Sequence, residues 1–225
     1  MSVRGLFRIA DVNVFIAAAT LFAAAAFVPG RAVAVEFDKL PKPQQAMLDD
    51  VEKRTFEYFR DSTNAANGLV PDHWPHEGGE YFSSIAAVGF GLTAWGIGVE
   101  RGWIPRAEAV KRTLVTLRFL HDAPQSDAVD ATGDHGFFYH FLDMDTGRRY
   151  QSKRWVELST IDTTLLLGGV LFAESYYDRN DADEKEIRRL ADEIYRRVDW
   201  QWASPRPPLV AMGWTPEADF IHADW

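Results

Sequence analysis

Two carboxylates flank the start of a strongly apolar segment, and their types and spacing could support acid–base chemistry. Glu157 and Asp162 lie in the run RWVELSTIDTTLLLGG, residues 154–169, which has hardly a polar residue after Asp162. Hydrolysis of a glycosidic bond requires two carboxyl groups, one protonated and one ionised. The sequence therefore offers Glu157 and Asp162 as candidate catalytic residues.

A purely structural explanation of the same two acids is also open. Ser159 is a good helix N-cap, and Asp162 three residues later completes an S-x-x-D variant of the capping box. An acid in the first turn stabilises a helix by about 0.3–1 kcal/mol. Glu157 precedes the cap and could pair instead with Arg154. From the sequence alone, both explanations stand.

Tryptophan is abundant, and much of it lies outside the expected helices. The chain has eight Trp in 225 residues. An aromatic ring offers a flat apolar face that suits the apolar face of a sugar ring, although Trp is just as often a core residue. The predicted cleft also includes an Asp–His pair that precedes an aromatic run. The candidate substrate-binding residues are Trp74, Asp134, His135, Phe137, Tyr139, Trp155 and Trp225.

Three other groups of polar residues are weaker candidates for a functional site. His73 and His76 have a spacing that could bind a metal, but no third ligand matches them. The run DMDTG, residues 143–147, lacks the length and the closing glutamate of a calcium loop and predicts a hairpin turn. Asp134 and His135 also fit an Asx-type turn. No metal and no cofactor are predicted.

The composition argues against several classes of protein. The formal net charge is −9, and no basic stripe or P-loop occurs, so nucleic-acid and nucleotide roles are disfavoured. The chain has no cysteine, which excludes disulfides and thiolate catalysis.

Residues 1–34 have the pattern of a secretory signal peptide. Arg4 and Arg8 precede an apolar run, and Ala32-Val33-Ala34 forms a small-x-small cleavage site. The run is shorter than the roughly 20 residues that span a bilayer, which disfavours the alternative of an uncleaved anchor. We expect cleavage before Val35, and a periplasmic or secreted protein without stable membrane association.

Five helices are expected after the leader, and their apolar patterns alternate. Segments 42–61, 105–120 and 183–198 are amphipathic, whereas 83–99 and 160–177 are apolar on nearly all sides. Glycines in segment 83–99 would let it approach its neighbours closely. Aromatic runs on both sides of residues 145–147 predict a β-hairpin. The ion pairs expected along the last helix are Glu184/Arg188, Asp192/Arg196 and Glu193/Arg197.

This alternation predicts an inner layer of helices wrapped by an outer layer. We expect an all-α fold for residues 35–225, the incomplete N-terminal part of an (α/α)6 barrel with a small β-hairpin insertion. An open helical array is the alternative, although no internal repeat supports it. Five helices cannot close such a ring, so we expect a truncated chain with a large exposed apolar patch on its inner helices. In a barrel, Glu157 and Asp162 would lie at the mouth, where the inner helices begin.

The sequence resembles the glycoamylase-like family of bacterial proteins, which includes endo-β-1,2-glucanases. The resemblance runs in order over nearly all of residues 50–225, in the segments VEKRTFEYF, SSIAAVGFGLTAW, HGFFYHFLDMDTG, ELSTIDTTLLLGGVLFAESYYD, EIYRRVDWQWA and GWTPEADF. It implies an (α/α)6 barrel that acts on β-linked glucans with acids in a cleft on one face. Asp162, followed by Thr163, matches the position of a family acid.

These observations lead to one expected function and two alternatives. We expect a secreted glycoside hydrolase of β-linked glucan, specifically β-1,2-glucan, that works through carboxylate acid–base hydrolysis. The first alternative is a non-catalytic glucan-binding protein of the same fold, and the second is a helical scaffold without a ligand. The expected partner is a polysaccharide or oligosaccharide, with no nucleic acid, and the full-length form is expected to be a monomer.

Overall fold

The computed structural model describes residues 36–75, 81–151 and 155–225, so the predicted signal peptide lies outside the described residues. The chain divides into two units, Met1–Leu48 and Asp49–Trp225. The described part of the first unit holds a 3-10 turn, η1 (Phe37–Lys39), and the first residues of α2 (Lys42–Ser62). The rest of α2 and all other helices and strands belong to the second unit.

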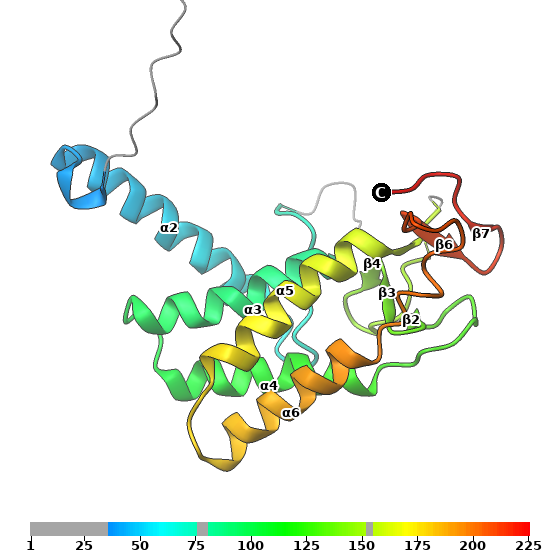
Figure 1. Cartoon of the computed structure of the whole chain (residues 1–225). Helices are drawn as coiled ribbons and strands as arrows, with labels where there is room; N and C mark the ends of the chain where they lie inside the picture. The colour runs from blue at the N-terminus through cyan, green and yellow to red at the C-terminus, as the bar shows by residue number, and fades with distance from the viewer. Residues whose placement is uncertain (1–35, 76–80, 152–154) are drawn as a thin grey trace, which may run out of the picture. The chain divides into compact units, whose positions relative to one another are not determined.

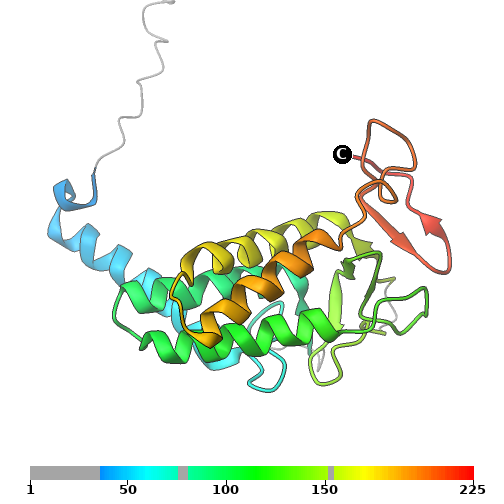
Figure 2. The ribbon, with the colours of Figure 1, turned by 60° about the horizontal axis from the view of Figure 1, so that its bottom comes forward.

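Four helices of the second unit pack into a bundle (Figures 1 and 2). In this bundle α3 (Ile85–Glu100) packs against α5 (Thr160–Tyr176), and α4 (Arg106–Asp122) packs against α6 (Ala182–Arg196). The predicted helix-rich fold is confirmed, and so is the apolar stripe of the last helix. The buried residues of that stripe are Ile187, Leu190, Ala191, Ile194 and Val198.

The helices α3 and α5 run parallel and approach closely because glycine lies at their contact. Gly89 lies against Leu165, and Gly96 lies against Phe172. Residue numbers therefore increase in the same direction along both helices. A Cβ on Gly169 would come within 2.1 Å of the Gly89 carbonyl oxygen. The expected role of small residues in close packing is confirmed. The parallel arrangement also places the N-terminal ends of both helices together.

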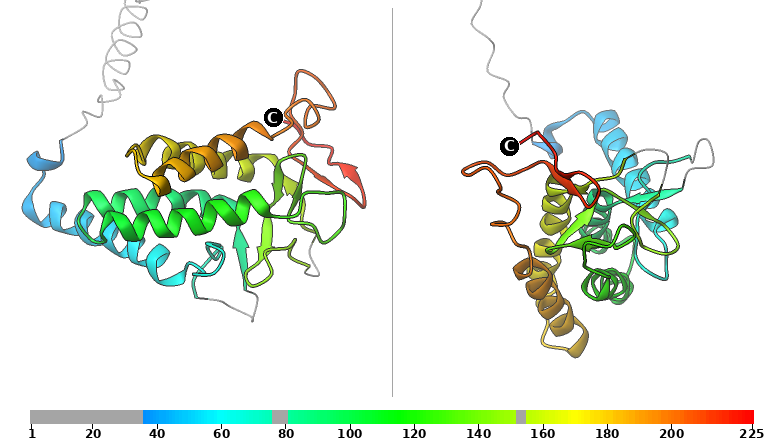
Figure 3. Two further views of the ribbon diagram at one scale, coloured as in Figure 1. Left: turned by 90° about the horizontal axis from the view of Figure 1, so that it is seen from below. Right: turned by 90° about the vertical axis from the view of Figure 1, so that its right-hand side faces the viewer.

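Two small sheets lie at the N-terminal ends of α3 and α5 (Figure 3). In one, β1 (Phe82–Ser84) pairs antiparallel with β4 (Phe141–Asp143). The other is antiparallel with the order β2-β3-β5-β6-β7. Its strands are β2 (Gly133–Asp134), β3 (Phe137–Tyr139), β5 (Leu158–Ser159), β6 (Gly213–Thr215) and β7 (Asp219–Phe220).

The expectation of one hairpin in an otherwise helical chain is therefore wrong. The turn itself forms, because the Asp143 carboxylate accepts the N–H groups of Asp145 and Thr146. After the turn, Arg149 forms a single bridge with Leu142 instead of a paired strand. The aromatic strands pair elsewhere: β4 pairs with the distant β1, and β3 lies between the adjacent β2 and the distant β5.

Two of the three ion pairs expected along α6 are replaced by contacts with α4. The expected pair of Asp192 with Arg196 forms, at 2.6 Å. Glu184 is buried and instead accepts two hydrogen bonds from Arg106, at 2.7 and 2.9 Å. The Glu184 carboxylate thus joins α6 to α4 rather than stabilising the surface of its own helix.

Arg197 is also turned inward and does not pair with Glu193, which binds Arg189 at 2.8 Å. Its guanidinium donates to the carbonyl oxygens of Leu120 and His121 at the end of α4. Burial lowers the pKa of the Arg197 guanidinium to about 10. The changed pairing of Glu184 and of Arg197 has one cause. Each side chain lies beside the interface with α4 and forms its hydrogen bonds with α4 instead of with its own helix.

Large apolar side chains are exposed on α3 and α5, as expected for the two apolar helices. Phe90 keeps 55% of its surface exposed, and the others are Ile97, Ile161, Leu165 and Leu171. Across the described ranges, no helix combines the length and the apolar character that crossing a bilayer requires.

Candidate active site

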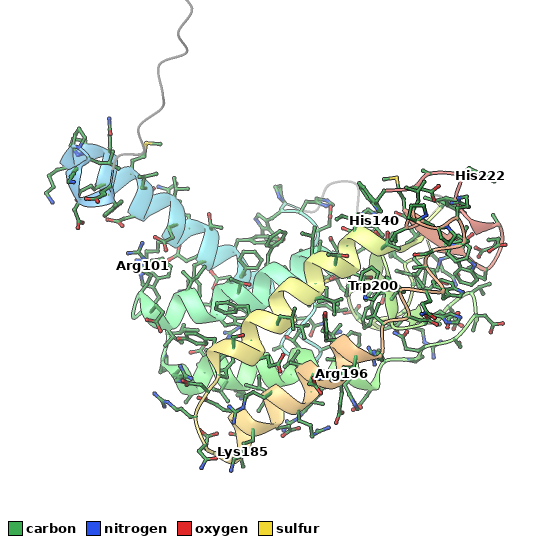
Figure 4. The ribbon with its side chains drawn as sticks, in the orientation of Figure 1. Arg101, His140, Lys185, Arg196, Trp200 and His222 are labelled. Atoms are coloured by element: carbon green, nitrogen blue, oxygen red, sulfur yellow. The ribbon has the colours of Figure 1, made fainter. Side chains whose placement is uncertain are left out.

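His140 lies between the two predicted catalytic carboxylates. Its Nδ1 is 2.9 Å from Glu157 Oε1, and its Nε2 is 3.6 Å from Asp162 Oδ2. In Figure 4, His140 lies at the end of the bundle where the strands gather, far from Lys185 on α6. The structure thus brings Glu157 and Asp162 together around one imidazole ring.

Strand pairing fixes the positions of His140 and Glu157. Tyr139 of β3 pairs with Leu158 of β5, so the next residue outward on each strand is His140 opposite Glu157, on one face of the sheet. The His140 N–H donates to the Glu157 carbonyl at 2.9 Å. The His140 carbonyl accepts the N–H of Ile85, the first residue of α3, at 3.1 Å. His140 is therefore tied to both the sheet and the start of a helix.

Asp162 is held by the cap of α5. Its backbone N–H donates to Ser159 Oγ at 3.2 Å, and the Ser159 hydroxyl donates to Asp162 Oδ2 at 2.5 Å. The predicted N-cap is confirmed. The same carboxylate also faces His140, so capping and a role in the site are compatible. Exposed side-chain fractions of 30% for His140, 22% for Glu157 and 13% for Asp162 leave all three reachable from solvent.

The surroundings of His140 favour its charged form. Burial lowers its pKa, but the hydrogen bond with Glu157 and the charges of Asp162, Glu157 and Asp72 together outweigh burial. The pKa of His140 is therefore raised above its ordinary value of 6.5. A protonated imidazole donates from both ring nitrogens, which suits a position between two carboxylates.

Aromatic rings form a wall beside His140. The His140 ring stacks on Phe141 with centroids 3.9 Å apart, and Phe141 lies 4.6 Å from Phe82. Phe82 in turn lies 4.9 Å from Tyr150. Such a wall of ring faces next to carboxylates is suited to a sugar.

Three of the predicted substrate-binding tryptophans are exposed. Trp225 donates through Nε1 to Thr160 Oγ1 at 3.2 Å, so it lies at the first residue of α5, close to Asp162. Trp155 is exposed two residues before Glu157, and Trp74 is exposed two residues after Asp72. Trp225 is thus placed beside Asp162, whereas Trp155 and Trp74 are near site residues in sequence, and the role of all three in binding stays a prediction.

The other four predicted substrate-binding residues do not join the site at His140. Phe137 and Tyr139 are fully buried, so neither can contact a substrate. Tyr139 lies under the Arg149 guanidinium, and burial raises its pKa to about 12. Both side chains lie on the face of the sheet opposite His140, because side chains alternate along β3.

Asp134 and His135 form the turn that was the alternative interpretation. The Asp134 carboxylate accepts the N–H of His135 at 2.8 Å, and His135 has a left-handed backbone with φ of 50°. The His135 ring stacks on Trp202 with centroids 4.3 Å apart. This pair therefore belongs to an aromatic cluster that also contains Phe137, Trp200 and Trp214.

The predicted absence of a metal centre is not contradicted by the part of the chain that the structure describes. There, no three His, Asp or Glu side chains converge in a way that could hold an ion. His73 lies 3.1 Å from Asp72, and His76 lies outside the described residues. The site is therefore built from carboxylates, one imidazole and aromatic rings.

Sequence reasoning missed His140 and Asp72. His140 lies in the run FFYHF, and its significance depends on which residue of β5 faces it. A histidine among buried aromatics was a signal, but only the register of β3 with β5 links it to Glu157. Asp72 comes near the site through a loop whose course no periodicity predicts. The alternative partner of Glu157, Arg154, lies outside the described residues.

Comparison with known proteins supports the predicted resemblance, although no family model matches the chain. An exo β-1,2-glucooligosaccharide sophorohydrolase of Parabacteroides distasonis is 28% identical over 185 residues, which cover 80% of this chain and 24% of that protein. The chain thus spans about a quarter of the length of this curated relative.

Solved structures show the same relationship. A β-1,2-glucanase from Parabacteroides distasonis has a TM-score of 0.68 and 28% identity, over 80% of this chain and 25% of that one. An endo-β-1,2-glucanase from Chitinophaga pinensis, in complex with sophorotriose and glucose, matches in fold with a TM-score of 0.66 and 24% identity, over 83% and 42% of the two chains. The resemblance to the glycoamylase-like, endo-β-1,2-glucanase-related proteins is confirmed.

Proposed function

We propose that this chain is part of a glycoside hydrolase that acts on β-1,2-linked glucan, with Glu157 and Asp162 as carboxylates of its active site. One observation carries the proposal: both acids meet at His140, where two parallel helices begin. The named activities of the relatives support β-1,2-glucan as the substrate.

The geometry supports distinct tasks for the three side chains. Glu157 shares a hydrogen bond with His140 and can exchange a proton with it. This suits Glu157 as the acid that protonates the leaving oxygen. Asp162 is the least exposed of the three and is fixed by Ser159, which suits a carboxylate that orients water or stabilises positive charge on the sugar. The aromatic wall of Phe141 and Phe82 would hold the sugar ring beside them.

We further propose that α3 and α5 are inner helices of an (α/α)6 barrel and that α4 and α6 are outer helices. The apolar character of α3 and α5 and their exposed large side chains support this arrangement. In this fold the site at His140 lies at the mouth of the barrel. The leader pattern in residues 1–34 supports action in the periplasm or outside the cell, and N-terminal sequencing of the mature protein would test cleavage before Val35.

The test is reducing-sugar release from linear β-1,2-glucan by a full-length protein that contains this chain and by its Asp162→Asn and Glu157→Gln variants. Asn keeps the capping geometry of Asp162 and removes the titratable group. If the acids are catalytic, turnover falls by about 10²–10⁴-fold in at least one variant while the melting temperature is kept. Glu186→Gln on α6, far from the site in sequence and paired with Arg118, is the matched control.

Two outcomes would contradict the proposal. Normal turnover in both variants would leave Asp162 as a helix cap and Glu157 as a structural partner of His140. Affinity for the glucan without any turnover in the full-length wild-type protein would support the non-catalytic glucan-binding alternative.

A further inference from the structure

A groove lies between the C-terminal half of α2 and Trp74. It has a volume of about 330 Å³ and is lined by Arg54, Glu57, Tyr58, Asp61, Ser62 and Trp74. That volume is at the lower end of the roughly 300–1,000 Å³ of small-ligand sites. The five α2 residues recur at intervals of three and four, so they form one face of the helix. Trp74 is 67% exposed, which is unusual for so large an apolar side chain.

The charges of this groove are balanced rather than of one sign. Arg54 pairs with Asp50 at 2.9 Å, and Asp61 pairs with Arg60 at 2.7 Å. Within the described ranges, no ion pair or hydrogen bond engages the Glu57 carboxylate. A groove with paired charges, one available carboxylate and an exposed indole offers little to a phosphate or a metal ion. It suits an uncharged ligand with many hydroxyl groups and an apolar ring face.

The segment 71–74 links the groove to the site at His140. Tyr58 donates its hydroxyl to the Pro71 carbonyl, next to Asp72. The charge of Asp72 contributes to raising the pKa of both Tyr58 and His140, so this carboxylate lies near both. A second connection runs through rings: His73, adjacent to Trp74, lies 5.6 Å from Phe82. Phe82 belongs to the aromatic wall that ends at His140.

We infer that this groove is an additional sugar-binding subsite, in which Trp74 stacks on one glucose unit of a glucan chain that also occupies the site at His140. The Glu57 carboxylate accepts hydrogen bonds from that unit's hydroxyl groups. This inference rests on the proposed function, because it requires a glucan at His140. It predicts that affinity increases with chain length until the groove is filled.

The test measures binding of a β-1,2-linked disaccharide and of a longer β-1,2-glucan oligosaccharide to the full chain by calorimetry. Loss of one aromatic stacking contact weakens binding by about tenfold. Trp74→Ala should therefore weaken binding of the long oligosaccharide by about that factor and leave the disaccharide unchanged. Trp74→Phe should restore part of the loss. Tyr195→Ala removes an exposed aromatic ring from α6 and is the control, with no expected effect.

The outcomes separate this inference from the proposed function. If wild-type protein binds the long oligosaccharide, and Trp74→Ala changes neither affinity or lowers both equally, the subsite does not exist while the proposed function stands. If wild-type protein binds neither ligand, the proposed function is wrong and the subsite falls with it. A melting temperature for Trp74→Ala close to that of the wild type would show that any loss of affinity does not come from unfolding.

Discussion

Replacing His140 with glutamine should destabilise the chain more at pH 5.5 than at pH 9. In the wild type, the imidazole lies 2.9 Å from Glu157 and 3.6 Å from Asp162, and its pKa is raised. A raised pKa in the folded state means that protonation stabilises the fold. This stabilisation is fully present below the unfolded pKa of about 6.5 and is lost as the pH rises through the higher folded pKa.

The magnitude follows from the kind of bond that is lost. A hydrogen bond to a charged group contributes about 1.5–3 kcal/mol. His140 is 30% exposed, so solvent screening reduces this to about 1–2 kcal/mol at pH 5.5. Near pH 9 the imidazole is largely neutral, and the amide of glutamine can donate to Glu157 in its place, so the expected loss falls to about 0.5 kcal/mol or less.

Urea unfolding of both proteins at the two pH values measures this difference. The comparison requires that the free energy of unfolding depend equally steeply on urea concentration in the two proteins. The other histidines are present in both proteins and cancel in the comparison. His222, labelled in Figure 4, is exposed, so His222→Gln controls for the loss of an exposed histidine. A loss of equal size at both pH values would refute the argument that the charged form of His140 is stabilised by its neighbours.

Three further outcomes are expected in urea unfolding or dye binding. Arg106→Met should cost about 3–5 kcal/mol because Glu184 is left buried without its partner, and a second change, Glu184→Leu, should recover much of that loss. Gly169→Ala should cost about 1–3 kcal/mol or more because its Cβ meets backbone, whereas Gly168→Ala, with open space around it, should be neutral or stabilising. Phe90→Ser should reduce binding of a hydrophobic dye and change stability by less than about 0.5 kcal/mol, since Phe90 is largely exposed. An unchanged dye signal, a tolerated Gly169→Ala or a stable Arg106→Met would contradict the respective argument.

Helix positions could be predicted because their evidence is local. The apolar periodicity of α4 and α6, Pro105 before α4 and Ser159 before α5 are each readable within a few residues. The same holds for the turn at Asp143. Glycine-rich α3 was predicted as a buried helix for the reason that the structure gives, close contact with a neighbour.

What could not be predicted depends on which distant strands pair. β1, which precedes α3, pairs with β4. β6, which follows α6, pairs with β5. These strands are two or three residues long, too short for an alternating pattern to stand out. The composition of the site follows from this pairing, so the two acids could be proposed from the sequence, whereas His140 between them could not.

Ser159 ends a strand paired on both edges and also caps a helix, and this double use makes the spacing of the two acids intolerant of length change. Phe138 pairs with it on one side and Gly213 on the other. The alternation of side chains along the strand decides on which face of the sheet Glu157 lies. The position of Asp162 in the first turn of α5 decides the direction of its side chain. Inserting one residue between Glu157 and Ser159 would turn Glu157 to the other side of the sheet while leaving Asp162 in place. Homologous chains that keep this site should therefore carry no insertion or deletion from Glu157 to Asp162.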